Sequence, residues 1–274
     1  MIEFPHCKIN LGLSILEKRK DGFHNLETVF YPVGLKDMIE IIPIKKNTQH
    51  VPFSSSGIAV PGKDSDNLCV KAYHILKNDF PHLSSIQMHL HKVIPMGAGL
   101  GGGSSDATAV IQLLNKLFSL QLSKDALLHY TALLGSDCPF FLYEQPCHAT
   151  GRGEILNALS LSLKEYQIIL IHPSISISTA WAFRQIQPAT KNKNIIEIIH
   201  QPIHSWKQEL INDFEAPILS AHPILQSIKN ELYEKGAIYA SMSGSGSSFY
   251  GIFEKSTKSL SFSFSSQMQV DFIA

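Results

Sequence analysis

Apolar and polar residues alternate near the N-terminus as they do in β-strands. The odd positions from Cys7 to Ile15 are apolar, which places Lys8 and Asn10 together on the opposite face of a predicted strand. Residues 86–93 alternate over much of their length and predict a second strand. The first strand therefore combines an apolar face for packing with a polar face that carries a lysine and an amide.

Capping residues and turn signals delimit the other predicted elements. Asn67, with Asp66 before it, can cap a helix over residues 68–78, and Ser123 can cap a helix that ends at Gly135. Further strands are expected over residues 38–44, 167–171 and 249–253, and further helices over residues 179–185 and 223–232. The polar segments that we expect to be irregular are residues 45–65 and 188–207.

The stretch from residue 95 to residue 105, here called the glycine loop, holds five glycines in seven residues. It follows the strand predicted over 86–93 and leads into a predicted helix with polar residues at its start. This arrangement binds phosphate, because backbone N–H groups and the positive end of the helix dipole face the anion. A tight turn is the simpler alternative, but so many glycines cost folding entropy and favour close approach of a ligand. The residues predicted to bind phosphate are Pro95, Met96, Gly97, Ala98, Gly99, Leu100, Gly101, Gly102, Gly103, Ser104 and Ser105.

Two common phosphate motifs fit this chain poorly. Gly97, Gly99 and Gly102 match the spacing of a dinucleotide fingerprint, but the acidic residue expected about 20 positions later at a strand end is missing. Gly62 and Lys63 nearly complete a Walker-type loop, yet an aspartate follows where that motif needs a hydroxyl. We interpret the second match as an exposed loop.

Composition limits the function classes further. Hydrophobic residues make up 44% and charged residues 17% of 274 residues, as in an ordinary globular protein. Lys plus Arg equals Asp plus Glu, so no global field attracts nucleic acid or a membrane, and anion binding must come from local geometry. Charged Glu3 and Lys8 interrupt any signal peptide, and no apolar run reaches membrane-span length. We expect a cytoplasmic protein, monomeric or homodimeric, whose four cysteines are free thiols.

Two other segments could carry chemistry. Asp137 stands between the end of a helix and a predicted apolar strand over residues 138–142, where it is either a turn residue or a catalytic carboxylate. A second glycine–serine segment, residues 241–248, is either a hairpin connection or a second face of the phosphate site. We place a domain boundary near residue 155.

Four segments, taken in order, resemble the GHMP small-molecule kinases. They are Lys8-x-Asn10 with Asp21-Gly22-Phe23-His24, the glycine loop, Gly135-Ser136-Asp137-x-Pro139-Phe140, and Met242-x-Gly244-x-Gly246. The resemblance implies an α+β, two-domain GHMP kinase fold, with an ATP-binding domain over residues 1–155 and a smaller α+β domain over 156–274. It also implies that ATP, with Mg²⁺, phosphorylates a hydroxyl group of a small molecule.

The resemblance also implies roles for individual residues. Asp137 matches the family's catalytic base, which accepts the proton of the attacking hydroxyl. Lys8 matches the catalytic lysine, which hydrogen-bonds this carboxylate and keeps it ionised. The glycine loop would hold the ATP phosphates, and Asp66, Asn67 and Lys92 fall near the family's adenosine contacts. The Mg²⁺ ligands stay open, with Ser104 and Ser105 as candidates.

The match is strongest to members that phosphorylate the 2-hydroxyl of a cytidine-diphosphate-linked methylerythritol, in the non-mevalonate isoprenoid pathway. In these members an aromatic pair sandwiches the cytosine and a histidine reads its edge, and Phe23, Phe183 and His24 occupy the matching positions. Phe23 replaces the usual tyrosine, which keeps the stacking surface and loses a hydroxyl. The other residues that the resemblance places at the substrate are Asn10, Thr179, Gly244 and Gly246.

Several alternatives stay open at this point. Another kinase of the family, acting on mevalonate, homoserine or a sugar, would share the loop but would not need the segment Asp21-Gly22-Phe23-His24. A related decarboxylase would use the same ATP loop. A nicotinamide-dependent dehydrogenase or a nucleotide-binding regulator without catalysis would belong to another class.

Overall fold

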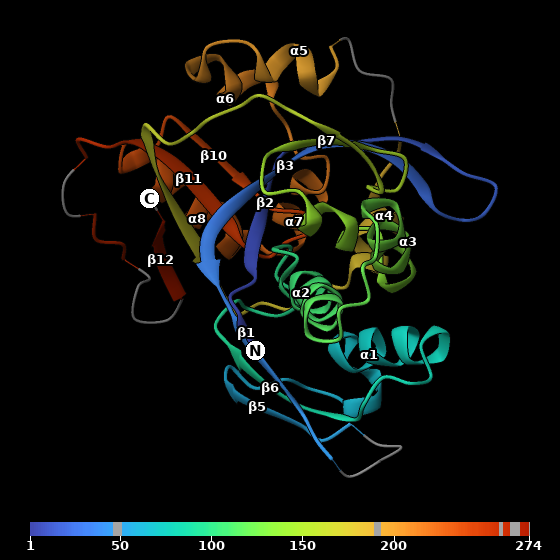
Figure 1. Cartoon of the computed structure of the whole chain (residues 1–274). Helices are drawn as coiled ribbons and strands as arrows, with labels where there is room; N and C mark the ends of the chain where they lie inside the picture. Colours follow the sequence, from blue (N-terminus) through green and yellow to red (C-terminus); the bar gives the residue numbers. More distant parts are fainter. Residues whose placement is uncertain (46–50, 189–192, 258–259, 264–268, 274) are drawn as a thin grey trace. The chain divides into compact units, whose positions relative to one another are not determined.

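The computed structural model describes residues 1–45, 51–188, 193–257, 260–263 and 269–273 (Figure 1). They form two compact units that alternate along the chain. The first unit holds Met1–Cys7, Leu35–Met96 and Gly101–Glu144, and the second holds Lys8–Gly34, Gly97–Leu100 and Gln145–Ala274. The expected boundary near residue 155 would divide the chain once, into two continuous domains, whereas these units are each made of several segments. That boundary stays a prediction.

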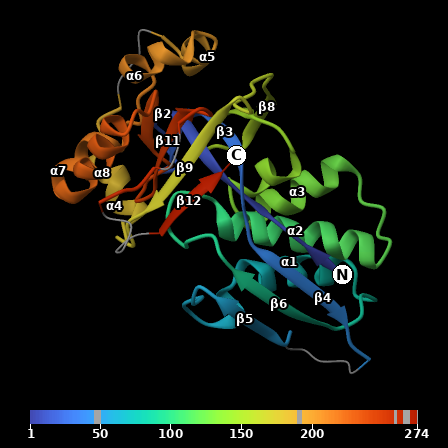
Figure 2. The ribbon, with the colours of Figure 1, turned by 90° about the vertical axis from the view of Figure 1, so that its left-hand side faces the viewer.

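The first unit is a four-stranded sheet with helices on one face (Figure 2). The strands lie in the order β1 (Ile2–Glu3), β4 (Met38–Pro43), β6 (Ile86–Lys92) and β5 (Phe53–Gly57), and only the β5–β6 pair is parallel. The helices are α1 (Leu68–Asp79), α2 (Gly102–Leu117) and α3 (Lys124–Leu134). Apolar side chains of β4 and β6, such as Ile41 and Leu90, are buried against helix residues such as Val110. This core fixes the end of β6 and the start of α2, between which the glycine loop runs.

The second unit contains an antiparallel sheet in the order β10 (Tyr239–Met242), β11 (Phe249–Glu254), β9 (Tyr166–His172) and β12 (Gln269–Ile273). Its core joins this sheet to α4 (Thr179–Gln185), α7 (Glu215–Ala221) and α8 (Pro223–Glu234), with Ile171, Ile218 and Ile228 among the buried residues. The hairpin between β10 and β11 carries the second glycine–serine segment.

A third sheet, in the order β2 (His6–Lys18), β3 (His24–Lys36), β7 (Cys147–Thr150) and β8 (Ile155–Ala158), lies largely in the second unit. The turn between β2 and β3 is closed by the Arg19 N–H, which donates to the Phe23 carbonyl at 2.8 Å. The remaining helices are α5 (Ile195–Ile199), α6 (Trp206–Glu209) and the 3₁₀ turns η1 (Asp64–Asp66), η2 (Cys138–Leu142) and η3 (Ile203–Ser205). Among the described residues, no helix is both long and apolar enough to cross a membrane.

Most predicted elements are confirmed, and the caps are the clearest cases. The Asn67 side chain accepts a hydrogen bond from the Cys69 N–H at 2.8 Å at the start of α1, and Ser123 accepts one from the Ala126 N–H at 3.2 Å at the start of α3. Helix α4 spans the predicted residues 179–185. Local hydrogen-bonding chemistry was therefore a sound guide to where helices begin.

Three expectations were wrong. Residues 138–142 form a 3₁₀ helix and not an apolar strand, because Pro139 in the first turn favours a helical start and Phe140 and Phe141 are both buried. Helix α2 begins at Gly102, ahead of the polar residues expected at its start. Strand β5 and helix α5 lie within segments expected to be irregular, of which residues 46–50 and 189–192 are outside the described part.

Candidate functional site

The glycine loop adopts backbone conformations that need glycine. Gly97, Gly99 and Gly101 have φ angles of +63°, +78° and +70°, in the left-handed region that other residues avoid. Gly101 is the N-cap of α2 and has no side chain with which to cap the helix. The first N–H groups of α2 are therefore left for other acceptors, as an anion site at a helix N-terminus requires.

Within the second unit, the second glycine–serine segment packs directly on residues 98 and 99. The Ser243 hydroxyl donates to the Gly99 carbonyl at 2.8 Å, and the Ser248 N–H donates to the Ala98 carbonyl at 3.2 Å. A Cβ on Gly99 would lie 1.9 Å from the Ser243 carbonyl oxygen. The segment is thus the connection between β10 and β11 and also a support for part of the glycine loop.

Lys8 and Asn10 share one face of β2, as predicted, but this face is not open to solvent. Their side chains are 3% and 1% exposed. The Lys8 ammonium donates to the side-chain amide oxygen of Asn10 at 2.6 Å and to the backbone carbonyl of Gly99 at 3.1 Å, and it lies 4.9 Å from the centre of the Phe30 ring. Asn10 donates in turn to the Thr28 hydroxyl at 3.0 Å. A buried positive charge is therefore held beside the glycine loop.

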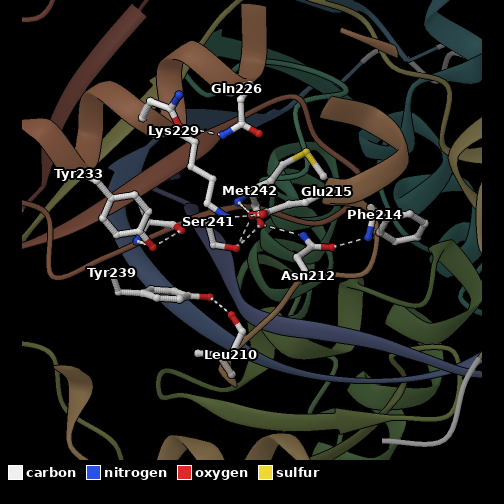
Figure 3. Close-up of polar contacts among 12 residues, drawn as sticks. Leu210, Asn212, Phe214, Glu215, Gln226, Lys229, Tyr233, Tyr239, Ser241 and Met242 are labelled. Carbon is white, nitrogen blue, oxygen red and sulfur yellow. Dashed lines mark hydrogen bonds and ion pairs between the residues drawn. The ribbon is translucent and has the colours of Figure 1, made fainter. Parts of the chain in front are cut away.

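A buried polar network holds the start of the second glycine–serine segment (Figure 3). Asn212 donates to the carbonyls of Met242 at 2.8 Å and Gly244 at 2.9 Å. One carboxylate oxygen of Glu215 accepts from the Ser241 hydroxyl at 2.8 Å and the Met242 N–H at 2.7 Å. The other oxygen of Glu215 pairs with Lys229. These contacts restrict the conformation of the segment that supports Gly99.

Asp137 lies in the first unit, half-buried, between the end of α3 and η2. The segment is tied to α2 because the Thr108 hydroxyl donates to the Cys138 carbonyl at 2.9 Å. The Asp137 carboxylate is therefore carried by a segment fixed to α2, the helix that follows the glycine loop. In the same segment, burial raises the pKa of the Cys138 thiol to about 11, and a hydrogen bond with Ser104 offsets only part of this rise.

A cavity of about 160 Å³ opens beside the glycine loop in the first unit. Asp66, Asn67 and Lys92, the three residues expected near adenosine, all line it, together with Met96 and Gly103 of the loop. Its other lining residues are Val60, Pro61, Leu68, Cys69, Leu90 and Asp106. Largely apolar walls with a few polar groups are typical of small-molecule sites.

The three residues predicted to contact cytosine lie in the second unit. His24 stacks on Phe183, with ring centres 4.9 Å apart and planes 19° apart. Phe23 is 55% exposed, and the Arg152 guanidinium lies 5.0 Å from the centre of its ring. Burial lowers the pKa of His24, and the nearby Lys18 lowers it further, so this ring is neutral at pH 7. The structure thus brings His24, and not Phe23, against Phe183.

The other predicted substrate residues lie around the second glycine–serine segment. The hydroxyls of Thr179, at the start of α4, and Ser245 are 2.9 Å apart. Gly244 and Gly246, on either side of Ser245, have φ angles of +56° and +83°. Three predicted positions therefore meet in one small region of the second unit.

Sequence reasoning missed Asn212 and Glu215. Both are buried polar residues, and their partners in the second glycine–serine segment stand 26 to 32 positions away in the chain. No local motif marks such contacts. The only signal in the sequence is that an amide and a carboxylate stand beside the apolar residues of a short helix. Such polar groups need hydrogen-bond partners when they are buried.

Comparisons with known proteins show the family of the chain. The family of GHMP kinases N terminal domains matches residues 67–145, and that of GHMP kinases C terminal domains matches residues 192–261. A protein of Bacteroides thetaiotaomicron named 4-diphosphocytidyl-2-C-methyl-D-erythritol kinase is 52% identical over 93% of this chain and 92% of its own length. One of the same name from Cytophaga hutchinsonii is 46% identical over 92% of each chain.

Solved structures extend the comparison. The crystal structure of a 4-(cytidine 5'-diphospho)-2C-methyl-D-erythritol kinase matches with a TM-score of 0.81 and 26% identity, over 100% of this chain and 98% of that one. A homoserine kinase from Cytophaga hutchinsonii has a TM-score of 0.68 at 16% identity over 99% of this chain and 92% of its own, and shares the fold alone. The expected α+β GHMP kinase fold is confirmed. The chain belongs to the GHMP kinase family and, within it, to the 4-diphosphocytidyl-2-C-methyl-D-erythritol kinases.

Proposed function

We propose that this protein transfers the γ-phosphoryl group of ATP to the 2-hydroxyl of 4-diphosphocytidyl-2-C-methyl-D-erythritol. The observation that carries the proposal is the 52% identity to a kinase of that name over 93% of this chain and 92% of that protein. The reaction forms a bond between the hydroxyl oxygen and the γ-phosphorus, breaks the bond to ADP and releases one proton.

The nucleotide occupies the first unit's cavity and the adjoining loop. The apolar walls of the cavity suit the adenine ring, and the uncapped start of α2 suits the phosphates. Mg²⁺ bound with the nucleotide would offset the charge of the phosphates, and few protein ligands would be needed to hold it. The Ser104 and Ser105 hydroxyls, at the start of α2, are the candidates to hold it.

Asp137 accepts the proton of the attacking hydroxyl, and Lys8 stabilises negative charge at the reacting group. The support for Lys8 is its burial and its fixed position, since hydrogen bonds to Asn10 and Gly99 hold an ammonium that has three donors. The support for Asp137 is its place on a segment that is tied to α2. General bases contribute about 10²- to 10⁴-fold to rates.

His24, Phe183 and Phe23 recognise the cytidine end of the substrate. A neutral histidine both donates and accepts a hydrogen bond, as reading the edge of cytosine requires. His24 stacks on one face of the Phe183 ring, so His24 and the cytosine would compete for that face. Asn10, Thr179, Gly244 and Gly246 contact the remainder of the substrate.

The test is release of ADP with Mg-ATP and the cytidine-diphosphate methylerythritol, with mevalonate and homoserine as alternative acceptors. We compare wild type with Asp137→Asn and with Glu165→Gln, a control that removes an exposed carboxylate. The proposal expects activity on the cytidine substrate alone, a loss of about 10²-fold or more in Asp137→Asn, and none in the control. If ADP were released only with another acceptor, the assignment of the substrate would be wrong. If Asp137→Asn were as active as wild type, the assignment of Asp137 as the base would be wrong.

A further inference from the structure

Three charged residues of the first unit, Asp37, Lys92 and Asp106, are buried together beside the glycine loop. Each is 1% exposed, and we call them the Lys92 cluster. Lys92 is the last residue of β6, Asp37 precedes β4, and Asp106 lies in α2. The cluster therefore joins the two elements between which the glycine loop runs.

Asp37 makes contacts that fix the backbone where the loop leaves β6. One carboxylate oxygen accepts hydrogen bonds from the N–H groups of Val93 at 2.6 Å and Ile94 at 2.8 Å. The other oxygen pairs with the Lys92 ammonium. The first residues after β6 are consequently held by one side chain from another part of the chain.

The Lys92 ammonium connects Asp37 to the start of α2. It pairs with the Asp106 carboxylate at 2.8 Å. A Cβ on Gly102, the first residue of α2, would lie 2.9 Å from the ammonium nitrogen and 2.8 Å from a methyl group of Ile94. The helix thus begins directly against the lysine, and the two ends of the loop are held at a set distance.

Stability alone does not explain this arrangement. An ammonium at a helix N-terminus opposes the helix dipole, and buried ion pairs contribute little net stability. Within the described part of the chain, Oδ1 of Asp106 is a buried oxygen without a hydrogen-bond partner, which is itself unfavourable. The cluster holds two carboxylates for one ammonium. Its position between the end of β6 and the start of α2 explains it better than a contribution to stability does.

We infer that Asp37 is a positioning residue for nucleotide binding. Through its bonds to Val93 and Ile94, and through Lys92, it sets the distance between the end of β6 and the start of α2. This distance determines the conformation of the glycine loop, whose N–H groups bind the phosphates. The inference rests on the proposed ATP site and does not depend on which hydroxyl compound is phosphorylated.

Two variants, compared at about pH 8.5, above the pKa of about 7 of the Asp106 carboxyl, remove the same charge and differ in geometry. In Asp37→Asn the amide can satisfy either the loop N–H groups or the Lys92 ammonium, but not both, because its nitrogen is a donor. In Asp106→Asn the amide oxygen still accepts from Lys92, and the amide nitrogen replaces the oxygen that has no partner. A charge effect would therefore appear equally in both variants, and a positioning effect would appear mainly in the first.

The experiment measures the dissociation constant of Mg-ADP by calorimetry and the KM for ATP and kcat by ADP release. We expect Asp37→Asn to weaken Mg-ADP binding and to raise the KM for ATP by about tenfold or more, with a smaller change in kcat. The loss of Mg-ADP affinity in Asp106→Asn should be smaller than the loss in Asp37→Asn by a factor of about three or more. Equal affinities of Asp37→Asn and wild type, or equal losses in both variants, would overturn the inference.

Two features keep the test decisive. If Asp37→Asn lacks the circular dichroism spectrum of wild type, the same comparison is made with Asp37→Ser, which retains one oxygen for the loop N–H groups. Calorimetry with Mg-ADP needs no acceptor. A wild-type protein that binds Mg-ADP but does not phosphorylate the cytidine substrate would therefore contradict the proposed function, while the affinities of the variants still judge the role of Asp37.

Discussion

Replacing Asp106 by asparagine should stabilise the ligand-free protein more and more as the pH rises from about 5 to about 8.5. Burial raises the pKa of this carboxyl from 3.8 to about 7, although the Lys92 ammonium lowers it, and the Asp37 carboxylate raises it further. The folded protein therefore keeps a proton that the unfolded chain releases near pH 3.8. Because the folded state binds more protons, the contribution of Asp106 to stability falls as the pH rises from the unfolded pKa of 3.8 to the folded pKa of about 7, and it is constant above this range.

The size of the effect follows from the shift. Each pKa unit corresponds to 1.36 kcal/mol, so a shift of about three units gives about 4 kcal/mol in total, of which about 3 kcal/mol develops above pH 5. Burial, followed by the charge of Asp106, raises the pKa of the Cys69 thiol in α1 well above its usual value. Cys69 thus stays neutral in this range. An asparagine cannot ionise, so the variant avoids the whole cost.

The assay is urea unfolding at several pH values for wild type, Asp106→Asn and the exposed-carboxylate control Glu165→Gln. The quantity of interest is the difference in unfolding free energy between each variant and wild type, because other titrating groups cancel in it. For Asp106→Asn this difference should grow by about 3 kcal/mol toward alkaline pH, and for the control it should stay flat. A flat difference for Asp106→Asn would refute the linkage between burial of this carboxyl and stability.

Four further outcomes are expected. Gly99→Ala should lower the melting temperature and weaken Mg-ADP binding, because its Cβ would lie 1.9 Å from the Ser243 carbonyl oxygen. Gly103→Ala should stabilise the ligand-free protein by about 1 kcal/mol in urea unfolding and yet weaken Mg-ADP binding in calorimetry. Asn212→Ala should cost about 2 kcal/mol or more of unfolding free energy, since two buried carbonyls lose their donor. The Cys138 thiol, whose pKa burial raises to about 11, should react with a thiol reagent at neutral pH only after denaturation.

The sequence predicted those parts of the fold that depend on short-range chemistry. Alternation placed Lys8 and Asn10 on one face of β2, and the caps at Asn67 and Ser123 located two helix starts. The glycine loop was found because its composition is unusual at a single place in the chain. Each of these signals lies within a few residues of the structure that it predicts.

What the sequence could not predict depends on contacts between distant residues. Asp37 stands 55 to 57 positions from the groups that it binds, and nothing beside it in the chain marks a role at the loop. The 3₁₀ helix at 138–142 was mistaken for a strand because a short apolar run does not distinguish the two. The stacking of His24 on Phe183 was also beyond the sequence, because these residues stand far apart in the chain and side-chain pairing is decided by the packed environment.

The glycines of the loop can now be separated by what requires them. Gly97, Gly99 and Gly101 have left-handed backbones, and Gly102 lies too close to Lys92 for a side chain. Gly103 differs, because it is helical, and a Cβ there would meet only an ordinary contact at 4.0 Å with a Leu68 methyl group. Glycine in a helix costs about 1 kcal/mol relative to alanine, so packing and backbone give no reason for it. Since it lines the cavity beside the loop, close approach of a bound ligand is the remaining physical reason.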